Sequence, residues 1–481
     1  MKNMNRRSFI KSTALGAAVF GIPARSWAQV PGANSDIRFA VVGFRGRGRD
    51  HIRGMGGVPG TRLTALCDVD KSVLEAEVKR LKEKGQEVEG YTDIRKLLES
   101  RNVDVVTIAT PNHWHSLAAI WAIQAGKDVY LEKPVSHNVS EGRRVVECAR
   151  KENRIVQAGT QSRSSITGIT EAVAWVRAGN LGKILISRGL CYKRRASIGK
   201  VDGPQPIPPE IDYELWCGPA LKLPLMRKNL HYDWHWVWNT GNGDLGNQGI
   251  HEMDVARWFL GVNELSPRVF SFGGRLGYID DGETPNTQVI YHDYPGAPLI
   301  FEVRGLPSKS DSTQMDKYKG ADIGIVIECE GGRVTVPSYT GAVAYDKEGK
   351  QIKEWRGSES HYANFAKAVR SRKKEDLNSD ILEGHLSSAL CHTGNISYVL
   401  GRKCPPDEIR EKIKGDRDMA ETFGRMKEHL AANGIDIAKD QVALGLVLKM
   451  DPKAERFTDN EKANEMLTRA YRPGFVVPSK A

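Results

Sequence analysis

The sequence predicts an α/β protein whose first domain is built on a parallel sheet. Between residues 37 and 157, short runs rich in Val and Ile alternate with segments of helical pattern, as in a doubly wound sheet. The first run leads into a glycine-rich turn, and the second run ends at an acidic residue. At 481 residues the chain is long enough for two domains, and we place the second at 158–400.

The strands of the first domain follow one another at regular intervals. We expect strands at 37–42, 62–67, 103–110 and 126–131, with helices between them, one of them at 118–125. Ligands of such sheets bind beyond the carboxyl ends of the strands. The segments 110–115 and 132–134 both lie in that place.

The turn after the first strand has the composition of a phosphate-binding loop: Gly43, Phe44, Arg45, Gly46, Arg47 and Gly48. Glycines let the backbone approach a pyrophosphate, and the helix that follows presents free N–H groups. Asp68 lies 25 residues after Gly43 at the end of the second strand, where a carboxylate accepts hydrogen bonds from both ribose hydroxyls. A carboxylate there repels a 2′-phosphate. These features indicate a Rossmann domain at 36–157 that binds NAD in preference to NADP.

One residue departs from the usual glycine pattern. The middle glycine of G-x-G-x-x-G is replaced by Arg45. Its guanidinium either contacts a phosphate or pushes the cofactor outward, and the alternative to both is a Rossmann domain with an empty site. The residues expected at the cofactor are Gly43, Phe44, Arg45, Gly46, Arg47, Gly48, Asp68, Thr110, Pro111, Asn112, His115, Glu132, Lys133 and Gln161.

Several motifs together resemble the glucose–fructose oxidoreductase/inositol dehydrogenase family (Gfo/Idh/MocA) over residues 36–400. They are Glu132-Lys133-Pro134 at a strand end, the turn at 179–184, and the segment 243–254. A His-Tyr-Asp-Trp-His-Trp run from His231 and a twin-arginine start resemble one exported subgroup especially. The resemblance implies a second, α+β domain with a largely antiparallel open sheet that covers the nicotinamide, binds sugars or polyols, and takes part in oligomerisation.

The resemblance implies that Lys133 and His251 are catalytic. An ammonium can bond a substrate hydroxyl and lower its pKa, and an imidazole can take the hydroxyl proton as hydride leaves. The alternatives are a surface lysine in a turn and a histidine that caps a helix. Asn247, four residues before His251, stands where many relatives have aspartate, and an amide can orient substrate but cannot accept a proton. Asp254 either orients His251 or pairs with Arg257.

The run from His231 to Trp238 is unusually aromatic. In an extended conformation its tyrosine and tryptophans share one face, which suits stacking on a sugar ring. The alternatives are an aromatic core layer and a metal site, although no carboxylate or cysteine cluster supports a metal. For His113 and His115 we prefer contact with substrate or nicotinamide. Residues expected at the substrate are Arg163, Tyr192, Arg195, His231, Trp234, His235, Trp236 and His251, and for the arginines and Tyr192 the alternative is ion pairs between domains.

Both ends of the chain lie outside these domains. Residues 1–28 have paired arginines, a short apolar stretch and a Ser-Trp-Ala end, which predicts a twin-arginine signal peptide cleaved after Ala28 and a periplasmic protein. The alternative is an amphipathic N-terminal helix. Residues 401–481 carry charged helical patterns and predict a helical extension that packs against a neighbouring subunit.

Composition excludes other classes. The net charge of +11 falls to +6 without residues 1–28, with 65 Lys and Arg against 59 Asp and Glu interspersed, so nucleic-acid binding is not expected. No apolar run spans a bilayer, which excludes an integral membrane protein and any stable membrane association after cleavage. The seven cysteines lack CxxC spacing, so we expect buried free thiols and no metal site.

The sequence therefore favours an NAD-dependent oxidoreductase acting on a sugar or sugar derivative, with a tightly bound and internally recycled cofactor, in a homo-oligomer. Tight retention follows because a protein exported in the folded state must load its nucleotide first. One alternative is an NAD-dependent glycosidase that oxidises a ring hydroxyl transiently, eliminates the aglycone, adds water and reduces again. The other is a sugar-binding protein without catalysis, against which the pair Lys133 and His251 argues.

Overall fold

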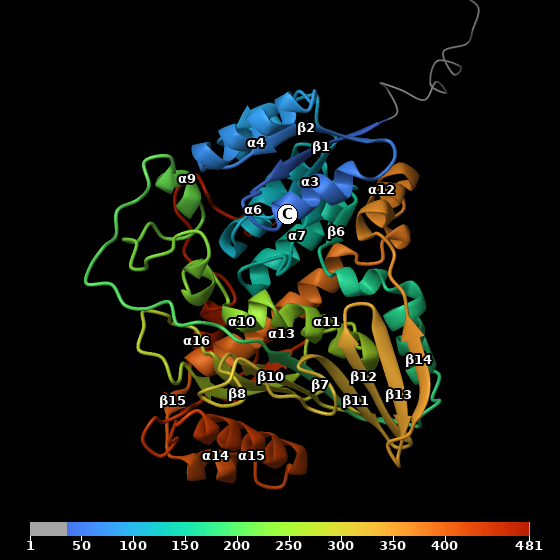
Figure 1. Ribbon diagram of the computed structural model, residues 1–481, viewed down its shortest axis with the longest axis vertical. Helices are drawn as coiled ribbons and strands as arrows, with labels where there is room; N and C mark the ends of the chain where they lie inside the picture. Colours follow the sequence, from blue (N-terminus) through green and yellow to red (C-terminus); the bar gives the residue numbers. More distant parts are fainter. Residues whose placement is uncertain (1–35, 481) are drawn as a thin grey trace, which may run out of the picture.

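The computed structural model describes residues 36–480, so the expected signal peptide lies outside the described residues. Figure 1 shows the first domain, in blue and teal, above a broad second sheet, with α10, α11 and α13 packed between the two. All seven cysteines are free and buried. Across residues 36–480, no helix is long and apolar enough to cross a membrane.

The first domain is a six-stranded parallel sheet in the order β3-β2-β1-β4-β5-β6. The predicted Rossmann architecture is confirmed. Its strands are β1 (Ile37–Val42), β2 (Thr61–Cys67), β3 (Glu89–Tyr91), β4 (Val105–Ile108), β5 (Asp128–Leu131) and β6 (Val156–Ala158). Its helices are α3 (Gly48–Gly56), α4 (Lys71–Glu83), α5 (Ile94–Leu98), α6 (Asn112–Gln124) and α7 (Val139–Lys151).

One detail of the first domain differs from expectation. Helix α6 begins at Asn112 and not at 118, so His113 and His115 lie in its first turn instead of in a loop. Pro111 stands just before this helix, where its missing N–H removes no helical hydrogen bond. The chain order reverses between β1 and β4, and the carboxyl ends of those strands open the crevice where doubly wound sheets bind ligands.

The second sheet is largely antiparallel, as the family resemblance implies; the pair β7–β10 is parallel. Its central strands follow the order β14-β13-β12-β11-β7-β10-β9-β8. The bounds are β7 (Ile184–Tyr192), β8 (Arg268–Gly274), β9 (Thr287–His292), β10 (Leu299–Arg304), β11 (Ile323–Cys329), β12 (Gly332–Ser338), β13 (Gly341–Asp346) and β14 (Gln351–Arg356).

Six α-helices are described in this part of the chain, and three of them, α10, α11 and α13, lie between the two sheets (Figure 1). The six are α8 (Glu171–Arg177), α9 (Tyr213–Cys217), α10 (Gly243–Asn247), α11 (Gly249–Leu260), α12 (His361–Ser371) and α13 (Ile381–Val399). Helix α12 packs on the first domain through Tyr362 and Phe365, although its residues lie in the range predicted for the second.

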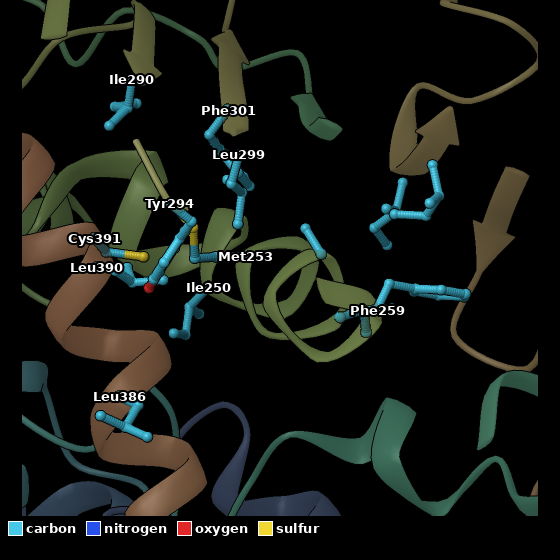
Figure 2. Close-up of a cluster of buried hydrophobic side chains, with 14 of the residues drawn as sticks. Ile250, Met253, Phe259, Ile290, Tyr294, Leu299, Phe301, Leu386, Leu390 and Cys391 are labelled. Carbon is cyan, nitrogen blue, oxygen red and sulfur yellow. The ribbon is translucent and has the colours of Figure 1, made fainter. Parts of the chain in front are cut away.

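The core of the second domain joins α11 and α13 to the sheet. In Figure 2, Met253 and Phe259 of α11 share a cluster with Phe301 of β10 and Leu390 of α13. Phe259 and Phe301 are fully buried. Burial of a side chain of this size contributes about 1.5–3 kcal/mol to folding. This packing fixes α11, and with it the candidate catalytic histidine, against a rigid sheet.

The C-terminal tail is more than the helical extension predicted. It adds strands to the second sheet and packs on its own chain: α15 buries Phe423 and Met426 against Phe272 of β8. Phe475 packs edge-on against Trp114 of the first domain, with ring centroids 5.7 Å apart. Its elements are β15 (Arg402–Lys403), α14 (Pro406–Lys412), α15 (Arg417–Ala432), β16 (Ala443–Leu444), β17 (Leu448–Asp451), β18 (Arg456–Phe457) and α16 (Glu461–Glu465).

Candidate functional site

A cavity of about 320 Å³ lies at the carboxyl ends of the first-domain strands. Its inner wall comes from the loops after β1, β2, β4 and β5, and its outer wall from residues 215–235 of the second domain. The structure brings these predicted site residues to the cavity: Gly43, Phe44, Arg45, Gly46, Arg47, Asp68, Thr110, Pro111, Asn112, His115, Glu132, Lys133, His231, Trp234, His235 and Asn247.

The glycine turn is shaped by close backbone packing. Gly43 has φ +75°, in the left-handed region that glycine favours, and a Cβ on Gly48 would lie 2.1 Å from the carbonyl oxygen of Gly43. A Cβ on Gly46 would instead meet nothing within 4 Å, because that residue faces the cavity. Gly48 therefore holds the turn together, whereas Gly46 leaves room for a ligand at the N-terminus of α3.

Asp68 closes the β2 side of the cavity. Its carboxylate accepts hydrogen bonds from the backbone N–H groups of Phe44 and Asp70, both at 3.1 Å. Burial raises the pKa of Asp68 to about 6, although these two donors act in the opposite direction. Arg45, the residue that replaces glycine, also stabilises the charged carboxylate. Asp68 is thus ionised at neutral pH and stands where a ribose would be recognised.

Glu132 anchors the opposite side. Its Oε1 accepts from Arg47 Nε at 2.9 Å and contacts His51 Nε2 at 3.0 Å, and Gln161 Nε2 lies 3.5 Å away. Burial opposes its charge, but the hydrogen bond with His51 and the charge of Arg47 hold the pKa of Glu132 well below its usual range. Gln161 and Gly48 do not themselves line the cavity.

Lys133 reaches across to the second domain. Its Nζ donates to the backbone carbonyl oxygen of Asn247 at 3.0 Å, and the Lys133–Pro134 peptide bond is cis. Burial lowers the pKa of Lys133, while Glu132 beside it acts to raise it. A partly desolvated ammonium at this position is a strong hydrogen-bond donor toward a substrate hydroxyl.

His251 lies on α11, four residues after Asn247. The predicted helix is broken between them, because α10 ends at Asn247 and α11 begins at Gly249. The His251 ring is buried, and within residues 36–480 its Nδ1 has no hydrogen-bond partner. Burial and the charge of Lys133 hold the pKa of His251 well below its usual value, so the ring is neutral at neutral pH.

Asp254 does not orient His251 in this structure. Its carboxylate accepts from Arg163 Nε and Nη2 at 2.8 and 2.9 Å and from the Ser387 hydroxyl at 2.7 Å, while Arg257 lies 3.8 Å away. Arg163, predicted to contact substrate, does not line the cavity. Its guanidinium is buried in a bidentate pair that ties α11 to the segment after β6, which is the ion-pair alternative.

The aromatic run folds differently from the extended ledge considered above. Residues Asp233–Trp236 form a short 3-10 helix, so alternate side chains do not share a face. The Trp234 and His235 rings stack with centroids 3.6 Å apart, and both line the cavity. Trp236 turns away and packs under Arg195, whose guanidinium is 5.3 Å from the ring and pairs with Asp244.

Other predicted substrate residues are also placed elsewhere. The Tyr192 hydroxyl donates to Glu302 at 2.7 Å and lies beside Arg425 of the tail, on the far side of β7 from the cavity residues. His113 contacts the carbonyl oxygens of Thr240 and Trp216 and does not line the cavity. The ring nitrogens of His115 contact the carbonyl oxygens of Thr110 and Pro134, so this histidine supports the wall.

The segment 205–240, which we call the cover, is fixed to the first domain. His231 Nε2 lies 3.0 Å from a carboxylate oxygen of Asp70, the residue that caps α4, and Ile211 forms an antiparallel bridge with Asp70. Trp114 Nε1 donates to the carbonyl oxygen of Leu215 at 2.9 Å. The tail holds the cover from outside, since Arg472 donates to the carbonyl oxygens of Glu214 and Gly218.

Sequence reasoning missed Leu215, Trp216, Gln248 and Tyr339 of the site, and it considered Lys193 as a residue that could line the pocket. Leu215 and Trp216 of α9 line the cavity, and Lys193, Gln248 and Tyr339 form a polar cluster beside His251. Only Lys193, in a basic run after β7, carried a signal in the sequence, because the others come together through tertiary contacts alone. Among residues 36–480 there is no group of three or more His, Cys, Asp or Glu side chains that could hold a metal ion.

Comparison with known families agrees with the geometry. Residues 37–160 match the oxidoreductase family with an NAD-binding Rossmann fold, and residues 173–311 match the C-terminal alpha/beta domain of the same family. The protein belongs to the Gfo/Idh/MocA oxidoreductase family. Its first domain is that family's NAD-binding Rossmann domain, with the cavity at the strand ends where a dinucleotide binds.

The curated relatives resemble part of the chain. A glycosyl hydrolase family 109 protein 2 of Shewanella sp. (strain ANA-3) is 30% identical over 163 residues, which cover 29% of this chain and 36% of the relative. Inositol 2-dehydrogenase 1 of Saccharopolyspora erythraea is 38% identical over 130 residues, covering 26% and 37%. The matches thus span little more than a third of these relatives' length.

Solved structures share the fold over a longer stretch. A levoglucosan dehydrogenase solved with NADH and levoglucosan has a TM-score of 0.55 at 16% identity, and the match covers 74% of this chain and 95% of that one. At this identity the likeness shows the fold alone.

Proposed function

We propose that this protein is an NAD-dependent oxidoreductase that transfers a hydride between a ring hydroxyl of a sugar or sugar derivative and a tightly held nicotinamide. The observation that carries the proposal is the hydrogen bond from Lys133 Nζ to the backbone carbonyl oxygen of Asn247, at the α10–α11 junction beside the dinucleotide cavity. Lys133 lines that cavity, and the buried His251, which does not line it, lies close enough for the charge of Lys133 to lower its pKa.

The residues around the cavity fit a dinucleotide. Gly46 leaves open space at the N-terminus of α3, where free N–H groups favour a pyrophosphate. The ionised Asp68 suits a ribose with two free hydroxyls, which favours NAD over NADP. Arg45 lies on the cavity wall and can reach a phosphate. Bound there, NAD would supply the hydride acceptor for the reaction.

The chain's own residues handle the proton. Lys133, held by the Asn247 carbonyl oxygen, donates a hydrogen bond to the substrate hydroxyl and lowers its pKa. His251, neutral because burial lowers its pKa, takes the hydroxyl proton at a ring nitrogen and returns it in the reverse direction. Asn247 cannot take this proton, so Lys133 and His251 are the acid–base pair.

Tight retention is supported by the cover. His231 at Asp70, Ile211 at Asp70 and Leu215 at Trp114 fasten it across the cavity at three points. Exchange of a bound nucleotide requires these contacts to open. This fits the further proposal that residues 1–28 are a twin-arginine signal and that the folded, loaded protein works in the periplasm as a homo-oligomer.

The test uses the purified mature protein and a panel of sugars and glycosides, with no NAD added and with mass spectrometry of the products. We expect a sugar lighter by two hydrogen atoms, its glycosidic bond intact, and reduced nicotinamide in the protein. Unchanged sugars together with a protein that releases no nucleotide on denaturation would contradict the proposal.

A second candidate is an NAD-dependent glycosidase, favoured by the likeness to a family 109 glycosyl hydrolase over 163 residues. In that reaction the ring hydroxyl is oxidised, the aglycone is eliminated, water adds, and the same hydride reduces the ring again. Because the amide of Asn247 cannot accept a proton, Lys133 and His251 would carry out every proton transfer of this reaction. Free aglycone with an unoxidised sugar in the same assay would establish this activity in place of net oxidation.

A further inference from the structure

Two lysines approach the reaction centre from different domains and are held by consecutive residues. Lys133 Nζ donates to the backbone carbonyl oxygen of Asn247 at 3.0 Å, and Lys193 Nζ donates to the Oε1 of Gln248 at 2.7 Å. Both ammonium groups act on His251, since each contributes to lowering its pKa. The α10–α11 junction therefore gathers two positive charges beside the candidate base.

Neither ammonium forms a direct ion pair in the part of the chain that the structure describes, although the charge of Glu132 acts on Lys133. Within residues 36–480, no carboxylate lies within ion-pair distance of Lys133 or Lys193, and both accepting oxygens belong to neutral amides. Glu132, the carboxylate nearest to Lys133 in sequence, is already engaged with Arg47 and His51. A pair of partly buried cations without a counter-charge is costly unless a ligand supplies the negative charge.

Glu252 is a further carboxyl group beside the pair. It is 1% exposed, and its Oε1 accepts from Gln248 Nε2 at 3.0 Å while Oε2 has no partner in the described chain. Burial raises the pKa of Glu252 to about 8, so this side chain is largely neutral at pH 7. It thus leaves the charge of the two lysines uncompensated.

A third donor faces the same place. The Tyr339 hydroxyl accepts from Gln248 Nε2 at 2.6 Å, which leaves its own proton to donate elsewhere. Its ring centroid lies 4.9 Å from that of His251, and the residue is 37% exposed. Lys133, Lys193 and Tyr339 thus offer three O–H or N–H donors around His251.

We propose that Lys133, Lys193 and Tyr339 bind a carboxylate of the substrate, so that the sugar oxidised here is a sugar acid such as a uronate. Lys193 is the specificity residue, because it serves no other charged partner and comes from the second domain. This inference rests on the proposed function: it names the substrate class of the same site. Charge-assisted hydrogen bonds of this kind discriminate strongly between a carboxylate and a hydroxymethyl group.

The experiment compares matched pairs that differ only at C6: D-glucuronate with D-glucose, D-galacturonate with D-galactose, and D-mannuronate with D-mannose. Binding to the nucleotide-loaded protein is followed by the fluorescence of bound reduced nicotinamide, and turnover by the absorbance of that nicotinamide. We expect at least one uronate to bind 10-fold or more tightly than its neutral partner, the size of one charge-assisted contact.

Three variants test whether the preference for a uronate over a hexose depends on Lys193 and the charge beside it. Lys193→Met is expected to bring the uronate-to-hexose ratio near one, and Lys193→Arg to keep most of it. Asn247→Asp, which is nearly isosteric, adds a negative charge at the residue whose backbone carbonyl holds Lys133 and is expected to weaken uronate binding specifically. The exposed Lys200→Met removes the same charge outside the cluster and is the matched control. The unfolding temperature of each variant separates misfolding from loss of recognition.

Two results would overturn the inference. One is a wild-type protein for which the neutral hexose equals or exceeds the uronate in every pair. The other is a Lys193→Met variant that weakens both members of a pair equally. Oxidation of neutral hexoses with no preference for the uronates would leave the proposed oxidoreductase function standing while removing this inference. Failure of every sugar to reduce the bound nicotinamide would contradict both.

Discussion

The cofactor side of the cavity and the polar cluster beside His251, which we call the substrate side, are built in different ways. The cofactor side comes from successive strand ends of one parallel sheet, with Gly43 to Gly48, Asp68 and Glu132 all within the first domain. The substrate side is assembled from distant parts of the chain: Lys133, Lys193, the α10–α11 junction and Tyr339. The cofactor side follows from the topology of one sheet, whereas the substrate side exists only after the two domains dock.

This difference suggests a division of work. The cofactor side binds a ligand whose shape is constant, and its geometry is set by backbone packing such as that of Gly48 on Gly43. The substrate side uses long polar side chains joined through Gln248, which can be exchanged without disturbing the sheet. Variants on the two sides should therefore change different properties.

The largest effect is expected on the substrate side. Lys133→Met removes the ammonium that activates the hydroxyl, and turnover should fall about 10²–10⁴-fold. The amount of nucleotide in the purified protein should remain close to that of the wild type, because methionine keeps most of the side-chain volume. Steady-state rates and the nucleotide content after denaturation check this, and loss of nucleotide without a specific loss of turnover would contradict it.

His251→Asn should lower turnover to a comparable or slightly smaller degree. An amide fills a similar volume but cannot accept the hydroxyl proton, so the remaining rate should rise with pH as hydroxide assumes the role of base. Rates measured over a range of pH for both proteins check this. An asparagine variant with the wild-type pH profile would show that His251 is not the base.

On the cofactor side, the contact between the cover and the first domain should control exchange. His231→Phe keeps an aromatic ring but loses the contact with Asp70, which lies 3.0 Å away. Release of bound nucleotide should become faster by about 10-fold, the size of one lost hydrogen bond to a charged group. Gel filtration followed by absorbance measures release, and the exposed Lys228→Ala in the same segment is the control. Unchanged release would mean that the cover does not hold the nucleotide.

Two glycines of one turn should separate stability from binding. Gly48→Ala forces a Cβ to within 2.1 Å of the Gly43 carbonyl oxygen and should lower the free energy of unfolding by about 1–3 kcal/mol. Gly46→Ala has open space and should leave stability unchanged while weakening nucleotide binding. Denaturant unfolding and nucleotide content measure the two effects, and equal destabilisation by both would contradict this reading of the turn.

The smallest effect concerns pH. Glu252 is protonated below its pKa of about 8 and gains a negative charge above it, so uronate affinity should fall severalfold as pH rises through 8. In Glu252→Gln this part of the decline should disappear, whereas the decline caused by deprotonation of Lys133 should persist. Titrations of both proteins measure the difference. The groups that face Glu252 are Lys193, Lys133, Asp244, Tyr339 and Cys191.

The sequence was informative where function depends on local order along the chain. The glycine turn, Asp68 and Glu132 could be placed because a βαβ unit fixes which residues end the strands. The structure has a 3-10 helix in place of the extended conformation considered for the aromatic run, because the local pattern of Trp234 and Trp236 does not distinguish the two. A strand would place every second ring on one face, whereas a 3-10 helix clusters neighbouring rings. Tertiary packing decides between the two conformations.

Charged residues were the hardest to assign. Arg163 and Tyr192 resembled pocket residues, yet their partners, Asp254 and Glu302, lie 91 and 110 residues away along the chain. Tyr339, which contacts Gln248, lies 91 residues from it and carried no signal at all. The role of a polar side chain depends on its partners, and these long-range partners are fixed by the docking of the two domains.

The central claim is that the protein holds its own NAD and uses it to oxidise a sugar at Lys133 and His251. The most direct measurement is a single-turnover assay on the purified protein without added nucleotide, followed by denaturation and identification of what is released. We predict nucleotide close to one per chain, converted from NAD to NADH when the sugar is added. Two results would contradict the account. One is a purified protein that releases no nucleotide. The other is a protein whose bound NAD is reduced by no sugar and which cleaves no glycoside.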